Sequence, residues 1–125
     1  MRIEFKVIPH EQQRYPTVGD YWLDENGVWQ FRVSDMGNPI YEKAVLLHEF
    51  IEWSLTQQRG ISEESISEFD IEFEKNRQDG DISECGDSPD APYRLEHRFA
   101  ENIERQFIHE SGIVWADYDN TVCNL

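Results

Sequence analysis

Apolar and polar residues alternate with a period of two at the start of the chain. Ile3, Phe5 and Val7 are separated by Glu4 and Lys6. This spacing is typical of a half-buried β-strand, which puts successive side chains on opposite faces. We predict a strand here that ends before the proline at position 9.

A second run of apolar residues predicts a β-hairpin. Residues 21–23 and Val28–Ser34 are rich in aromatic and β-branched side chains, and they flank the sequence Asp-Glu-Asn-Gly at 24–27. Asn-Gly between two such runs is a strong hairpin signal because both residues tolerate a positive φ. The N-terminal third of the chain should therefore form a small antiparallel sheet, made of a hairpin and one further strand.

After the sheet the apolar residues recur at helical spacing. Asn38 and Pro39 suit the cap and first position of a helix, which we expect to cover Pro39–Gln58 and to stop before Gly60. Its apolar residues cover most of the helix circumference, as in a central, largely buried helix. We expect a second helix after Ser62 that fades near Gly80.

The rest of the chain predicts a loop, a third helix and a short closing segment. Residues 78–92 are rich in Gly, Pro and Asp, and we expect the acids of this loop to be solvated. Residues 92–111 have helical spacing, and residues 113–122 follow them. With 125 residues, the chain is long enough for one hydrophobic core. We predict a single α+β domain, residues 1–125, with a small N-terminal antiparallel sheet packed on about three helices.

Charge limits the partners of such a domain. The chain has 26 acidic and 11 basic residues and a formal net charge of -15. This charge repels phosphates and anionic membrane surfaces, so we expect no direct nucleic-acid binding and no membrane association. Cys85 and Cys123 have no C-x-x-C spacing and are expected to be free thiols. The chain start lacks the pattern of a signal peptide, so we expect a cytoplasmic location; the sequence gives no indication of oligomeric state.

Polar residues on apolar helix faces are the candidate site. His48 and Glu52 lie one turn apart inside the apolar sector of the first long helix. His97 and Glu104 are placed similarly on the third helix, and Asp70 borders the apolar face of the second. Imidazole and carboxylate groups bind divalent transition metals, so these residues predict a metal site, for zinc first and otherwise for manganese or iron. The alternative is a buried network of His–Glu hydrogen bonds.

The sequence His48-Glu49-Phe50-Ile51-Glu52 resembles the H-E-x-x-H helix of zincin metallopeptidases. In that family the first His binds zinc and the adjacent Glu is the general base, which implies these roles for His48 and Glu49. Glu52 stands where zincins have their second His, so a further ligand is expected from His97, with Asp70 or Glu104 in reserve. The chain also resembles a set of small bacterial and phage proteins that carry an H-E-x-x-E helix and a later E-H segment, a resemblance that implies no activity.

Three functions are open at this point. One is a minimal zincin-like hydrolase in which Glu49 activates water. The alternative for Glu49 is a solvated residue on the polar side of its helix. Another is a magnesium-dependent nucleotide pyrophosphohydrolase that would use Glu49, Glu52, Asp70 and Glu74. The third is an acidic binding or inhibitor protein that imitates DNA to engage a basic protein partner, with no catalysis.

Overall fold

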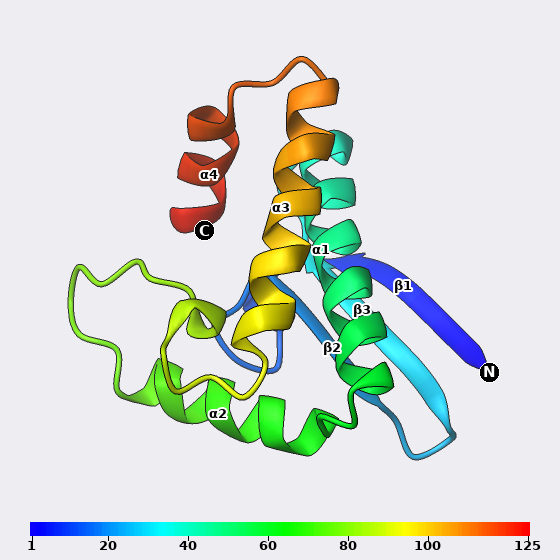
Figure 1. The fold of residues 1–125 in the computed structure, drawn as a ribbon. Coiled ribbons are helices and arrows are strands. Elements are labelled where there is room, and N and C mark those ends of the chain that lie inside the picture. Colours follow the sequence, from blue (N-terminus) through cyan, green and yellow to red (C-terminus); the bar gives the residue numbers. More distant parts are fainter.

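A computed structural model describes all 125 residues and contains a three-stranded sheet at the N-terminal end of the chain (Figure 1). The strands are β1 (Arg2–Ile8), β2 (Gly19–Leu23) and β3 (Val28–Ser34), in the order β1-β3-β2. β2 and β3 form the predicted antiparallel hairpin. The Asp24 carboxylate accepts hydrogen bonds from the backbone N–H groups of Asn26 and Val28, and Gly27 adopts a φ of 76°.

The sheet is mixed, so the prediction of a wholly antiparallel sheet is wrong for its first strand. β1 pairs with β3 in parallel, with Arg2 opposite Val28 and Ile8 opposite Ser34. The segment between β1 and β2, which includes the short 3-10 helix η1 (His10–Gln12), carries the chain past one strand position. β3 then fills the gap between them and runs in the direction of β1. The alternating pattern specifies the faces of a strand but not its direction.

Four helices follow the sheet: α1 (Pro39–Gln58), α2 (Glu63–Lys75), α3 (Arg94–Glu110) and α4 (Trp115–Cys123). The α+β class is confirmed. α2 ends at Lys75, earlier than predicted, and the closing segment is a fourth helix. The Asn38 side chain caps α1 by accepting from the N–H groups of Ile40 and Tyr41. None of the helices has the length and apolar character that crossing a membrane would require.

α1 and α3 lie side by side and run in opposite directions (Figure 1). α1 also contacts β2 and β3, so it lies at the centre of the fold, as its apolar circumference predicted. α2 crosses below this pair, and α4 folds back beside α3. The connection between α2 and α3 contains a second 3-10 helix, η2 (Cys85–Asp87), which contacts both of them.

Two apolar clusters form the core, and α1 contributes to both. One cluster contains Trp53 of α1 and aromatic residues of the sheet, including Phe31. The other contains Ala44 and Val45 of α1 with residues of β3, α3 and α4. Along α1, His48 and Glu52 come between these two contributions. The fold therefore buries a polar layer between two apolar ones.

Candidate metal centre

His48 of α1 is held by groups that come from two other helices. The residue is 6% exposed, and its Nδ1 atom lies 2.7 Å from Oε1 of Glu104 on α3. The Tyr118 hydroxyl of α4 donates to the other oxygen of Glu104. Because an ionised carboxylate only accepts, His48 must donate from Nδ1. This fixes the orientation of the ring and directs Nε2 to the opposite side.

Three potential ligand atoms lie close together, and one of them is Nε2 of His48. It lies 3.2 Å from Oε2 of Glu52 and 3.2 Å from Nδ1 of His97, and the last two atoms are 3.1 Å apart. The atoms thus form a nearly equilateral triangle. Ligand atoms at zinc bond lengths of about 2.0–2.2 Å in a tetrahedral shell are about 3.3–3.6 Å apart. The triangle is within a few tenths of an ångström of three corners of such a shell.

The charges of these atoms favour a cation between them. With neutral rings that have lone pairs on these nitrogens, the triangle would contain three lone pairs, one of them on a carboxylate. With protons on both nitrogens, the His48 ring, which also donates from Nδ1, would be positively charged, and two N–H groups would be directed toward each other across 3.2 Å. A divalent ion could accept all three lone pairs, and it would leave further coordination positions free.

Without an ion, the electrostatics favour the protonated histidines. Burial lowers the pKa of His97, but contacts with the Glu52 and Glu84 carboxylates outweigh burial and raise it to about 10. For His48, Glu104 and Glu52 overcome the same effect of burial and raise the pKa well above its usual value. Burial alone would raise the pKa of Glu52, but hydrogen bonds from the two histidines lower it to about 2. Protons and a metal ion would therefore compete for the same nitrogens.

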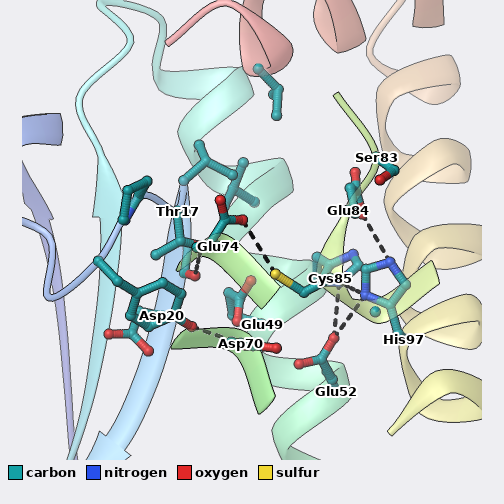
Figure 2. A pocket seen from close by; sticks show the side chains of 18 of the residues that line it. Thr17, Asp20, Glu49, Glu52, Asp70, Glu74, Ser83, Glu84, Cys85 and His97 are labelled. Atoms are coloured by element: carbon teal, nitrogen blue, oxygen red, sulfur yellow. Dashed lines mark hydrogen bonds and ion pairs between the residues drawn. The ribbon is translucent and has the colours of Figure 1, made fainter. Parts of the chain in front are cut away.

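These residues line a cavity of about 330 Å³. Figure 2 shows Glu52 and His97 on one side of it, with Glu49 and Asp70 nearer the middle. Pockets of this size accommodate small ligands or a few residues of a longer chain. The candidate ligands therefore face a space that a substrate could enter.

Glu49 lies in this cavity and not on a solvated side of α1. Its side chain is half-buried and makes no hydrogen bond within the chain. It rests against the backbone of β2, where a Cβ atom added to Gly19 would come within 2.6 Å of Oε1 of Glu49. Burial, and then repulsion from Glu52, raise its pKa well above the usual value. A raised pKa makes the carboxylate a stronger base.

Asp70 is in the cavity, but both of its carboxylate oxygens already accept hydrogen bonds from the protein. One carboxylate oxygen accepts from the Tyr15 hydroxyl at 3.0 Å, and the other from the Tyr93 hydroxyl at 2.5 Å. Glu74 is similarly engaged by Arg77 and by the Cys85 thiol. The four acids considered for a magnesium site share one cavity, but two of them are thus occupied by donors from the protein.

Glu104, a reserve ligand in the sequence prediction, lies on the other side of His48. Its 2.7 Å contact is with Nδ1, so it orients the ring and does not join the triangle. Carboxylates in this position are a recurrent feature of histidine metal sites. Glu96, which precedes His97, pairs instead with Arg59 at 2.5 Å and connects the end of α1 to the start of α3.

Several residues at the site were not identified from the sequence. The Tyr21 hydroxyl donates to Glu52 at 3.2 Å, and a Cβ atom added to Gly86 would come within 2.3 Å of the His97 ring. Glu84 and Asp87, expected to be solvated, approach His97 at 2.8 and 3.5 Å. The only feature of the sequence that indicated a function for this loop was its length.

Both cysteines are free thiols, as predicted. The other two histidines lie outside the site: His10 forms a hydrogen bond with Ser34, and His109 is exposed.

No protein-family model, curated protein or solved structure matches the chain. The side chains themselves offer two imidazoles and one carboxylate in a triangle, each supported by neighbouring groups and facing a cavity that also contains Glu49.

Proposed function

We propose that the protein is a small metal-dependent hydrolase, with His48, Glu52 and His97 as the metal ligands and Glu49 as the general base. The observation that carries this proposal is the triangle of ligand atoms, with sides of 3.1–3.2 Å. Two histidines and one glutamate are a known ligand set of catalytic zinc, and three protein ligands leave a position for water or substrate.

The chain supplies the groups that such a site needs around its ligands. Glu104 fixes the tautomer of His48, and Tyr21 donates to the oxygen of Glu52 that does not face the histidines. A divalent ion held by the three ligands would supply Lewis acidity for hydrolysis. Glu49 would take a proton from the attacking water, since its raised pKa favours that role.

The first test is the metal content of protein purified without chelator or histidine tag. Mass spectrometry should find about one equivalent of zinc, manganese or iron that depends on this site, and a His48→Ala variant should lose that equivalent. His109→Ala is the matched control, because it removes an exposed histidine that has no contact with the site. Circular dichroism would establish that both variants fold.

Catalysis is tested separately by Glu49→Gln. This variant should keep its metal and lose hydrolysis of peptide, ester and phosphoester substrates. If the purified metal is iron, oxygen-activating chemistry replaces hydrolysis as the proposal, because two histidines and one carboxylate also hold non-haem iron. If neither the wild type nor His48→Ala holds metal, the proposal fails, and a basic protein partner for the acidic surface becomes the hypothesis to test.

A further inference from the structure

The second ring nitrogen of His97 points away from the triangle and into a group of acids. The His97 side chain is 7% exposed. Its Nε2 atom lies 2.8 Å from Oε2 of Glu84 and 3.5 Å from Oδ1 of Asp87. Figure 2 shows Glu84 above the ring and Glu52 below it. The imidazole is therefore placed between two separate sets of carboxylates.

Nε2 of His97 lacks a well-aligned hydrogen-bond partner despite these short distances. The Glu84 oxygen is near enough to form an ion pair but lies too far from the direction of the N–H bond to accept from it. A buried polar atom that is left without a partner is uncommon and costly. This nitrogen thus has bonding capacity that the chain does not satisfy.

The relative positions of Nε2 and the Glu84 oxygen fit two ligands of one ion better than a hydrogen-bond donor and its acceptor. Atoms that bind the same ion point toward the ion and not toward each other. At bond lengths of about 2.0–2.2 Å, neighbouring ligand atoms lie about 2.8–3.5 Å apart. The distances from Nε2 to Glu84 and Asp87 fall in this range, and the three atoms lie within 4.8 Å of one another.

Gly86 holds the two acids in this position. It lies between Glu84 and Asp87 in sequence, and its backbone is so close to the ring that a Cβ atom would come within 2.3 Å of Cγ of His97. The glycine is buried although the neighbouring loop residues are largely exposed. The close contact of backbone and ring places one carboxylate on each side of the glycine near Nε2.

We propose that Glu84, Asp87 and Nε2 of His97 form a second site for a divalent transition-metal ion. The site does not require the first one: with the inner triangle empty, Nδ1 keeps the ring proton and the Nε2 lone pair binds the outer ion. With both ions bound, the imidazole would have lost its N–H proton to water, and each of its two nitrogens would hold one ion. Imidazole with carboxylates suits zinc or manganese.

Equilibrium dialysis of the full chain against zinc, followed by metal analysis, tests this proposal. The wild type should bind two zinc ions per chain, and the double variant Glu84→Gln/Asp87→Asn should bind one. The control Asp79→Asn/Asp90→Asn removes two exposed acids of the same loop, carries the same change of net charge, and should bind two. His48→Ala should lose the inner ion and keep the outer one.

The four proteins together separate the two proposals. One zinc ion that is lost in His48→Ala and kept in the acid double variant overturns the second site and leaves the proposed function standing. One ion that is lost in the acid double variant and kept in His48→Ala supports the second site and overturns the proposed function. Equal stoichiometry in the wild type and the acid double variant, or no zinc in any of them, contradicts the outer site.

Discussion

The cavity has a histidine side and a tyrosine side, and each contains a buried carboxylate. Glu52 accepts from two imidazoles and from Tyr21, and its pKa is lowered to about 2. Asp70 accepts from two tyrosine hydroxyls, and burial raises its pKa to about 7 although the hydrogen bonds oppose this. The two acids are 4% and 8% exposed, so burial does not distinguish them. The charge of the donors does, and Glu52 alone is kept as an anion ready to bind a cation.

Replacing each of the two acids by its amide should give the largest difference in zinc affinity between the two sides of the cavity. Glu52→Gln removes the carboxylate of the triangle, and we expect zinc affinity to fall by at least about a thousandfold, roughly 4 kcal/mol. Asp70→Asn removes an acid from the same cavity and should leave zinc affinity nearly unchanged. Competition titrations with a zinc chelator measure both. Equal losses in the two variants would mean that general negative charge, and not the triangle, attracts the ion.

Gly86→Ala tests the position of His97. The new methyl group would overlap the imidazole ring, so either the ring or the 84–87 segment must move. We expect zinc affinity to fall by about a hundredfold, roughly 3 kcal/mol. Asp79→Ala, on the exposed part of the same loop, serves as the control. An unchanged affinity in Gly86→Ala would indicate that the His97 position is not needed.

Glu104→Gln tests how much the carboxylate that orients His48 contributes to metal binding. The amide can still contact Nδ1 of His48, but it no longer holds that ring by charge. Loss of such an outer carboxylate typically costs about 10–100-fold in metal affinity, and we expect that range here. Glu110→Gln, on the exposed end of α3, should have no effect. A loss as large as that of Glu52→Gln would instead identify Glu104 as a direct ligand.

The smallest effect that we predict is the pH dependence of stability on the tyrosine side. The folded pKa of Asp70, about 7, is higher than the value near 4 of an unfolded chain. Between these values the folded state binds more protons, so this group lowers the free energy of unfolding as pH rises from about 4 to 7. Urea denaturation at pH 5 and pH 8 should show a smaller decline for Asp70→Asn than for wild type, by at least about 1 kcal/mol. Parallel declines would contradict the raised pKa.

The sequence predicted the fold where local pattern determines it. The hairpin turn, the Asn38 cap and the central position of α1 were all predicted from residues close together in the chain, although α1 is less buried than predicted, with Ile40 and Phe50 exposed. The direction of β1 depends on a crossover through residues 9–18, for which no local pattern exists. α4 was not recognised as a helix, because its nine residues follow Gly112 without a capping side chain.

The candidate site was predictable through its helices and not through its loop. Polar residues at the apolar faces of α1 and α3 identified His48, Glu52 and His97, because a buried polar group needs a partner. Whether the two helices bring these residues together depends on how the helices pack, and in the structure the three side chains lie side by side. Glu84, Gly86 and Asp87 have no periodicity, so only the tertiary contact with His97 reveals them.

The inner ligands are far apart along the chain, and this has a mechanical consequence. Glu52 and His97 are separated by 45 residues, and they come from helices that have no covalent connection near the site. An ion bound to both would act as a removable cross-link, which closes that stretch of chain as a disulfide would and restricts the unfolded ensemble. The rate at which α1 and α3 separate would then depend on how fast the ion leaves, and chelators would loosen the whole domain.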